Sequence, residues 1–168
     1  MLVHLENAST NDFQNLAKHI KIEIKELEKY LHWDTAHYTR NCIRRTEKFE
    51  LIALCWEPHQ ETPIHCHGGE ECWVYMVDGE LEESRFEEED FDCEKEKQKM
   101  SLGEYQISYM EDTQGYHSLS NLTSKRAVSL HLYHKPISSC RIYNKELQSF
   151  KWVEMSDYSF EGKLLQEA

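Results

Sequence analysis

Two histidines separated by a single residue carry the strongest chemical signal in the chain. His65 and His67 lie in the run Thr-Pro-Ile-His-Cys-His-Gly-Gly. In a β-strand, residues i and i+2 point to the same face, about 6 to 7 Å apart. Two imidazoles placed in this way can converge on one metal ion, because neutral imidazole is a common metal ligand. Gly68 and Gly69 then break the strand, so the pattern predicts a metal site at the end of a strand.

The segment after these glycines decides which side chain faces that site. The apolar run from Cys72 to Val77 predicts a strand, and Asp78-Gly79 is a strong hairpin signal. This arrangement resembles the first motif of the cupin superfamily, in which a glutamate ligand, six further residues and a glycine follow His-x-His. Cys72 occupies the glutamate position here, and Glu71 is one residue out of register. Because a one-residue slip on a strand turns a side chain to the opposite face, we predict that Cys72 faces the site.

A third histidine lies further along the chain, in the run Gly-Tyr-His-Ser-Leu-Ser-Asn that ends at Asn121. Cupins take another histidine ligand from a later strand, and His117 matches that place as a Gly-x-His followed by an asparagine four residues later. We therefore interpret His117 as the third ligand, beside His65 and His67.

Composition limits the class of protein. The 168 residues, with a net charge of −12, suit one domain spanning residues 1–168. The negative charge argues against a nucleic-acid partner, since phosphates need a basic surface. We see no signal peptide and no apolar stretch near 20 residues, which predicts a cytoplasmic protein without a membrane partner and with reduced thiols. We further expect a monomer.

Periodicity predicts a helical segment followed by a β-barrel. Residues 9–32 carry an amphipathic stripe with apolar residues at three- and four-residue steps, and a break near residues 18–21 would give two N-terminal helices that cover the barrel. From about residue 36 to about residue 155 the pattern consists of short β-rich runs between turn signals. The predicted strands are 37–43, 49–56, 62–67, 72–77, 81–87, 94–101, 105–110, 116–121, 127–133, 139–143 and 150–155. Such a series suggests a mostly β fold, a cupin-type antiparallel barrel or jelly roll.

One acidic stretch is interpreted as surface rather than as a site. Residues 82–92 contain seven carboxylates. A run of like charges is usually solvated, so we predict that most of this stretch forms an exposed hairpin tip.

Four separated segments together resemble the cysteine dioxygenase type I family of cupins. They are Tyr38-Thr-Arg40-Asn, the His65-x-His67 motif with Cys72, Gly-x-His117, and Ser129-Leu-His131-Leu-Tyr133 followed by Pro136 and Cys140. The similarity runs from about residue 38 to about residue 155. Ordered agreement across four segments is much stronger than any single motif.

The resemblance implies a role for each matching residue. His65, His67 and His117 would bind a mononuclear Fe(II), and Arg40, with Tyr38 beside it, would bind the substrate carboxylate. The implied active-site group is Tyr133, with His131 and Ser129 as its hydrogen-bonded partners, and Cys72 would form a thioether cross-link with Tyr133. The positions of Cys140 and Met155 match pocket-side residues. The implied reaction inserts both atoms of O₂ into the sulfur of L-cysteine and gives cysteine sulfinate.

The chain departs from the family at one point of the backbone. Animal members have a proline two residues after the tyrosine, preceded by a cis peptide bond, whereas this chain has Lys135 there and Pro136 next. A non-proline cis bond costs about 2.5 to 4 kcal/mol, so we predict a trans bond before Lys135.

Other functions remain open at this point. Dioxygenases of 3-mercaptopropionate resemble this family but carry glutamine at the position of Arg40, which favours cysteine as the substrate; cysteamine is a further candidate thiol. A non-catalytic cupin that binds a metal or a small ligand is an alternative of another class. A cupin isomerase or sugar-binding enzyme fits less well, because the motif glutamate is missing. Three histidines also suit Zn(II), Ni(II) and Cu(II), so iron follows from the resemblance alone.

Overall fold

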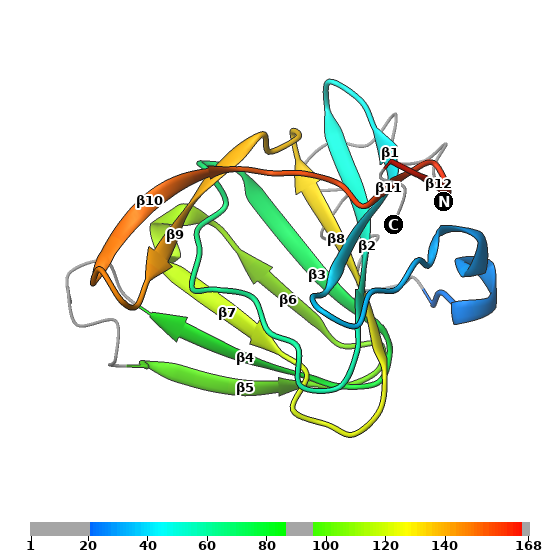
Figure 1. Cartoon of the computed structure of the whole chain (residues 1–168), viewed down its shortest axis with the longest axis horizontal. Helices are drawn as coiled ribbons and strands as arrows, with labels where there is room; N and C mark the ends of the chain where they lie inside the picture. Colours follow the sequence, from blue (N-terminus) through cyan, green and yellow to red (C-terminus); the bar gives the residue numbers. More distant parts are fainter. Residues whose placement is uncertain (1–20, 87–95, 166–168) are drawn as a thin grey trace.

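A computed structural model describes residues 21–86 and 96–165 of the chain (Figure 1). The described part is mostly β. Its strands are β1 (Thr39–Arg45), β2 (Phe49–Trp56), β3 (Glu71–Asp78), β4 (Leu81–Phe86), β5 (Gln98–Leu102), β6 (Ile107–Met110), β7 (Tyr116–Ser120), β8 (Ala127–His134), β9 (Ser139–Asn144), β10 (Ser149–Glu154), β11 (Ser159–Phe160) and β12 (Lys163–Leu164). Its short 3₁₀ turns are η1 (Ile24–Glu26), η2 (Glu28–Tyr30) and η3 (Asp112–Gln114).

The strands form one large sheet and two small ones. The large sheet has the order β12-β11-β1-β2-β8-β3-β6, and the small sheets are β5-β4-β7 and β10-β9. All strand pairs are antiparallel except β1 with β11. Figure 1 shows β5-β4-β7 facing the large sheet, with the β9-β10 hairpin at the side of the barrel away from the 3₁₀ turns. The predicted cupin-type barrel is confirmed, and strands 49–56 and 81–87 agree with the observed bounds to within a residue.

Alternation along the strands of the large sheet separates its two faces. On β2, Ile52, Leu54 and Trp56 point into the barrel and pack against Leu81 and Leu119 of the small sheet. The intervening residues of β2, with their neighbours on β3 and β8, form a second cluster on the outer face. Because both faces are covered, all eight residues of β2 are buried. Side chains on the inward face of the sheet point into the barrel, where a site would lie.

The outer face is covered by the N-terminal segment. Ile22 and Leu27 pack into the outer cluster, and the backbone amide of Ile22 donates a hydrogen bond to the Tyr75 hydroxyl at 3.2 Å. The predicted covering role is correct, but the predicted helix is wrong where the structure describes it. Within residues 21–32 the structure has the two 3₁₀ turns η1 and η2 and no α-helix. Their apolar spacing was interpreted as a helix, although packing against the sheet needs only the two buried anchors. Residues 9–20 of that prediction lie outside the described residues.

A second correction concerns the segment of the histidine pair. Residues 62–67 were predicted as a strand, yet within the described chain they belong to no named strand. Isolated bridges link Glu61 to Ser120 and His65 to both His117 and Ile142. The segment is extended and receives main-chain partners from two different sheets, so it closes the barrel between them.

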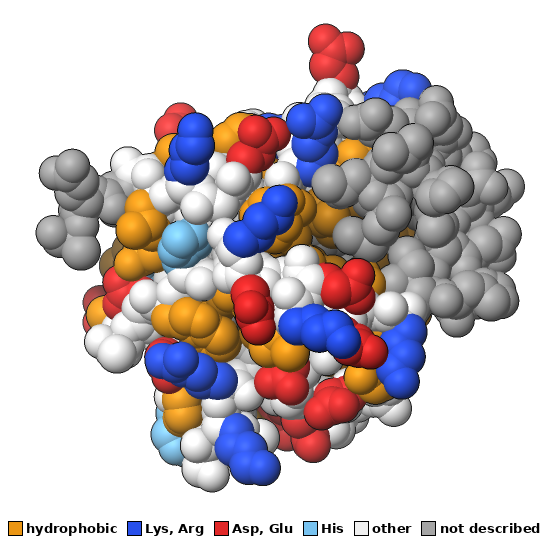
Figure 2. Space-filling view, turned by 90° about the vertical axis from the view of Figure 1, so that its right-hand side faces the viewer, with side chains coloured by type: hydrophobic (Ala, Val, Ile, Leu, Met, Phe, Trp, Pro, Cys, Tyr) orange, Lys and Arg blue, Asp and Glu red, His pale blue; other side chains and the backbone are white. Residues whose placement is uncertain are grey.

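The face in Figure 2 bears mixed charge. Lysine and arginine side chains are interspersed there with aspartate and glutamate rather than gathered in one basic patch.

We predict that Gly79→Ala lowers the free energy of unfolding by at least about 1 to 3 kcal/mol. Gly79 has a φ of +76°, and a Cβ at this position would lie 2.9 Å from both the Ala127 side chain and the Arg126 carbonyl oxygen. Denaturant unfolding followed by circular dichroism measures the change. Gly103→Ala is the matched control, because its Cβ would meet only the Gln106 side chain at 3.8 Å. Equal stability of the two variants would contradict this account of the β3-β4 turn.

Candidate metal centre and adjoining cavity

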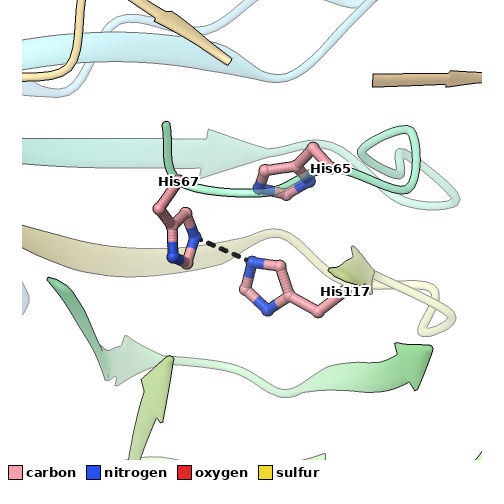
Figure 3. A group of neighbouring side chains, drawn as sticks. All are labelled: His65, His67 and His117. Carbon is pink, nitrogen blue, oxygen red and sulfur yellow. Dashed lines mark hydrogen bonds between the residues drawn. The ribbon is translucent and has the colours of Figure 1, made fainter. Parts of the chain in front are cut away.

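Three histidines point toward one another inside the barrel (Figure 3). Ring nitrogens of His65, His67 and His117 all lie within 4.8 Å of one another. The Nε2 atoms of His67 and His117 are 3.0 Å apart. The three residues predicted as metal ligands are therefore brought together.

Main-chain hydrogen bonds hold two of these histidines against each other. The amide of His65 donates to the carbonyl of His117 at 2.9 Å, and the amide of His117 donates back to the carbonyl of His65 at 3.0 Å. After His67 the chain turns at Gly68, whose φ is +65° and whose Cβ, if present, would lie 2.5 Å from the Ser139 carbonyl oxygen. Glycine is therefore required next to the histidine pair.

A buried carboxylate orients His117 from behind. The Nδ1 atom of His117 lies 2.9 Å from Oε1 of Glu83, a residue of β4 with no exposed surface. An ionised carboxylate only accepts hydrogen bonds, so Nδ1 carries the proton and the Nε2 lone pair is directed at the other histidines. Arg85 Nε donates to Glu83 Oε1 at 3.2 Å, and Ser108 Oγ donates to Oε2 at 2.5 Å.

Glu83 is an exception within the acidic stretch that was predicted to be mostly exposed. The carboxylates of residues 82–92 were predicted to be mostly a solvated tip, and residues 87–92 lie outside the described part. Glu82 is partly exposed and pairs with Lys99 at 3.0 Å, as a surface residue would. Glu83 alternates to the opposite face of β4 and enters the core. The available signal was the period of two along Leu81–Phe86, which places Leu81 and Glu83 on one side.

Electrostatics keep the buried histidines neutral. Burial, reinforced by the neighbouring histidines, holds the pKa of His67 well below its usual value. Burial, the nearby His65 and the Arg85 guanidinium do the same for the pKa of His117. Neutral imidazoles are the form that binds metals.

The donor set fits a divalent ion. Two ligands at about 2.1 Å from one ion, at right angles to each other, would be about 3 Å apart, which agrees with the 3.0 Å between the two Nε2 atoms. The histidines could thus occupy neighbouring positions of one coordination sphere, with Glu83 holding His117 in place.

A cavity of about 380 Å³ adjoins this centre. Its lining contains His65 together with the predicted pocket residues Tyr38, Arg40, His131, Tyr133, Cys140 and Met155. Residues predicted from five separate parts of the sequence therefore meet in one space. Cys140 and Met155 also contact each other, with their sulfur atoms 3.4 Å apart.

Arg40 lines this cavity and has two donors without a hydrogen-bond partner. Its side chain is 9 % exposed, and its Nε and Nη2 atoms are buried without a hydrogen-bond partner. Burial alone would lower the pKa of Arg40, but the nearby Tyr133, Glu50 and Asp157 raise it above its ordinary value. The guanidinium thus stays charged, and two of its donors make no hydrogen bond within the described part of the chain.

The tyrosine and cysteine of the predicted pair are neighbours. Cys72 on β3 lies directly opposite Tyr133 on β8, and both side chains belong to the same buried cluster. Burial, together with the adjacent Cys72, raises the pKa of Tyr133 well above its usual value. The Tyr133 ring centroid also lies 5.7 Å from that of His67, so the pair adjoins the histidine cluster.

A chain of polar contacts supports the tyrosine from the side. The indole N–H of Trp56 donates to Ser129 Oγ at 3.0 Å, and Ser129 Oγ lies 2.9 Å from His131 Nε2. His131 stacks on Tyr133 with ring centroids 6.3 Å apart, and Trp56 stacks on Tyr38 at 4.9 Å. Trp56 was missed from the sequence because an aromatic residue in an apolar strand is usually core.

The structure also shows the two positions at which the sequence departs from the family pattern, Glu71 and Lys135. Glu71 points away from the histidines and accepts a hydrogen bond from the Tyr109 hydroxyl at 2.7 Å, as the register argument predicted. No cis peptide bond occurs within residues 21–86 and 96–165, and Lys135 adopts a φ of +69°. The predicted trans bond before Lys135 is therefore confirmed.

We predict that Glu83→Ala weakens Co(II) or Fe(II) binding about 10- to 100-fold, because His117 loses the acceptor that fixes its orientation. Glu83→Gln keeps an oxygen acceptor and should lose less affinity. Anaerobic titration of apoprotein with either metal measures the dissociation constant. Glu82→Gln on the same strand is the control and should bind as the unaltered protein does. Unchanged affinity in a folded Glu83→Ala protein would contradict the role assigned to Glu83.

Comparisons with known proteins place the chain among enzymes. The family model for cysteine dioxygenase type I matches residues 1–146. Cysteine dioxygenase type 1 of Danio rerio is 29% identical over 163 residues, with 94% of this chain and 81% of the relative covered. The Rattus norvegicus protein of the same name is 31% identical over 134 residues, with 77% of this chain and 67% of the relative covered.

Solved structures agree on the fold. A Klebsiella pneumoniae protein with a double-stranded β-helix domain has a TM-score of 0.56 at 14% identity, covering 77% of this chain and 95% of that one. An RmlC-like cupin of Desulfovibrio desulfuricans has a TM-score of 0.53 at 18% identity, covering 71% and 100%. Among the described residues, no helix is long and apolar enough to cross a membrane. By the match to the family model, the chain belongs to the cysteine dioxygenase type I family of oxidoreductases.

Proposed function

We propose that this protein is an Fe(II)-dependent thiol dioxygenase that converts L-cysteine and O₂ into cysteine sulfinate. The observation that carries the proposal is that the lining of one cavity contains both His65, one of the three clustered histidines, and Arg40, a buried guanidinium with two donors that lack a hydrogen-bond partner. A thiol at the metal and a carboxylate at Arg40 are the two ends of a small mercapto acid.

Arg40 supplies recognition of the carboxylate. The Nε and Nη2 atoms of a guanidinium form parallel donors that match two carboxylate oxygens, and these are the two Arg40 atoms without partners. Because the site is buried, this charge-assisted pairing would be stronger than at a surface. Tyr38 lies beside Arg40 in the lining, stacked on Trp56, which limits its movement.

His65, His67 and His117 would hold the iron. When bound, Fe(II) supplies the Lewis acidity that keeps the substrate sulfur as thiolate and the electrons that activate O₂. The three neutral imidazoles add no negative charge, and Arg85 offsets the charge of Glu83 behind His117. The protein therefore leaves the centre cationic, which favours an anionic thiolate.

Tyr133 would orient the substrate by donating a hydrogen bond to it. Its hydroxyl stays protonated, since burial raises its pKa, so it can donate a hydrogen bond to the substrate. The contacts from Trp56 through Ser129 to His131 position the ring stacked on Tyr133.

Oxygen uptake tests the function. Protein loaded anaerobically with Fe(II) is mixed with O₂ and, side by side, with L-cysteine, 3-mercaptopropionate or cysteamine, and the products are identified by mass. We expect uptake with L-cysteine and a product heavier by two oxygen atoms. Uptake with 3-mercaptopropionate alone would overturn the substrate but keep the iron site. No uptake with any thiol, despite bound iron, would favour a non-catalytic metal-binding cupin.

We predict that Arg40→Ala raises the KM for L-cysteine about 10- to 100-fold, because a charge-assisted hydrogen-bond pair is lost. Iron content should stay near that of the unaltered protein, since Arg40 contacts none of the three histidines. Arg126→Ala, which removes an exposed ion pair with Glu57, is the control. An unchanged KM would rule out the carboxylate role.

We predict a thioether between Cys72 and Tyr133 in a fraction of protein that has turned over. The sulfur would bond to the ring carbon beside the hydroxyl, and the two hydrogens lost would reduce O₂. Peptide mass spectra should show the joined peptides lighter by two hydrogen atoms. Exclusively free Cys72 after many turnovers would count against the cross-link.

The proposal also covers the cellular location and the oligomeric state of the protein. We propose action as a monomer in the cytoplasm, where the five cysteines that the structure describes would remain thiols, as they are here.

A further inference from the structure

A β-bulge places a second arginine on the same face as Arg40. The pairing of β1 with β2 shifts register between Cys42 and Arg44, so that Arg40 lies opposite Leu54 and Arg45 lies opposite Glu50. Leu54 and Glu50 are four residues apart on β2 and share its inward face. The bulge therefore brings Arg45 to the side of the sheet on which Arg40 lies.

Two carboxylates lie between these arginines. Arg45 hydrogen-bonds Oε1 of Glu50 through Nε at 2.6 Å and Oδ2 of Asp157 through Nη2 at 2.7 Å. Each carboxylate turns its other oxygen toward Arg40: Glu50 Oε2 and Asp157 Oδ1 both lie 3.9 Å from Arg40 Nη2. Asp157 is fixed in place because the next residue, Tyr158, donates its amide to the Arg40 carbonyl at 2.7 Å.

The four charged groups form a cluster at the edge of the cavity. Glu50 and Asp157 have side-chain exposures of 0 % and 6 %, and their Oε2 and Oδ1 atoms have no hydrogen-bond partner. Asp157 lines the cavity with Arg40, whereas Arg45 is 37 % exposed at the outer end. Although Cys42, Glu50 and Asp157 could in principle hold a metal, the two guanidinium groups already supply the positive charge there.

The charges of the cluster cancel: two guanidinium groups face two carboxylates. A ligand carboxylate that approached Arg40 Nη2 would meet the repulsion of Glu50 Oε2 and Asp157 Oδ1 in a buried setting, where charge interactions are strong. The distance of 3.9 Å is too long for direct hydrogen bonds from Arg40 to these oxygens. Glu50 and Asp157 therefore attract the charge of Arg40 but accept no hydrogen bond from its Nη2 atom.

We propose that Glu50 and Asp157 compete with the substrate carboxylate for Arg40, and that Arg45 limits this competition by binding both carboxylates. The cluster is then a specificity determinant: it sets how strongly a carboxylate-bearing thiol binds relative to a thiol without a carboxylate. The inference rests on the proposed role of Arg40 in the preceding section. Glu50 is the one charged residue of the otherwise apolar and uncharged β2, and its position beside Tyr133 on β8 puts it next to the cavity wall.

Equilibrium binding tests the competition without turnover. Metal-loaded protein is titrated anaerobically with 3-mercaptopropionate and with cysteamine, and the ratio of the two dissociation constants is compared among variants. We expect Glu50→Gln and Asp157→Asn each to lower the dissociation constant for 3-mercaptopropionate about three- to tenfold. Arg45→Met should raise it by a similar factor. Cysteamine brings an amine and no carboxylate for Arg40, so its binding should not tighten in either carboxylate variant.

Opposite signs distinguish this role from a structural one, because loss of packing would weaken binding in every variant. Arg44→Met, next to Arg45 on β1 but paired with the exposed Glu161 at 3.2 Å, is the matched control and should leave both constants unchanged. Thermal unfolding verifies that each variant is folded. Weaker 3-mercaptopropionate binding in both carboxylate variants, or equal effects on the two thiols, would overturn the proposal.

The result also separates this inference from the proposed function. If no thiol is oxidised but the opposite shifts persist, the dioxygenase proposal fails and the charge competition stands. If L-cysteine is oxidised but the shifts are absent, the dioxygenase proposal stands and the competition fails.

Discussion

A reciprocal pair of main-chain hydrogen bonds between His65 and His117 is the constraint on which the site depends. These residues are far apart in sequence, and the segment of His65 is held in no regular strand. The segment is also tied to β7 through the Thr62 amide, which donates to the Leu119 carbonyl at 2.9 Å, and to β9 through the Cys66 amide, which donates to the Arg141 carbonyl at 3.1 Å. The main-chain hydrogen bonds bring the side chains of His65 and His117 together, and the contact with Glu83 sets the direction of the His117 ring.

The inward face of the large sheet organises the remaining chemistry into rows. Cys72, Tyr133, Glu50 and Arg45 are successive cross-strand partners on β3, β8, β2 and β1. This row links the pair proposed to cross-link with the charge cluster behind Arg40. Neighbouring strands lie about 4.8 Å apart. Arg45 on β1 is thus only two strands away from Tyr133 on β8, so a change in its charge alters the electrostatic potential at the tyrosine.

Much of the fold was predictable from the sequence because the strands alternate cleanly and end at strong turn signals. The spacing of His65 and His67 and the register of Cys72 predicted which face these residues occupy. His117, Arg40 and Tyr133 were found through the resemblance to a known family. Glu83 and Glu50 were not found, because a buried carboxylate reveals itself through its partners, and Ser108, Arg45 and Asp157 come from strands or loops other than those of the carboxylates they contact. The helix prediction for the N-terminal segment was wrong for a related reason. Apolar residues at helical spacing also occur in a short non-helical segment that packs two side chains, here Ile22 and Leu27, against a sheet.

The most direct test of the account is a crystal structure of the Fe(II)-loaded protein with L-cysteine, prepared without oxygen. We expect iron on His65, His67 and His117, the substrate sulfur facing the iron, and the carboxylate on Nε and Nη2 of Arg40. Iron bound elsewhere, or a cysteine carboxylate that avoids Arg40, would contradict it.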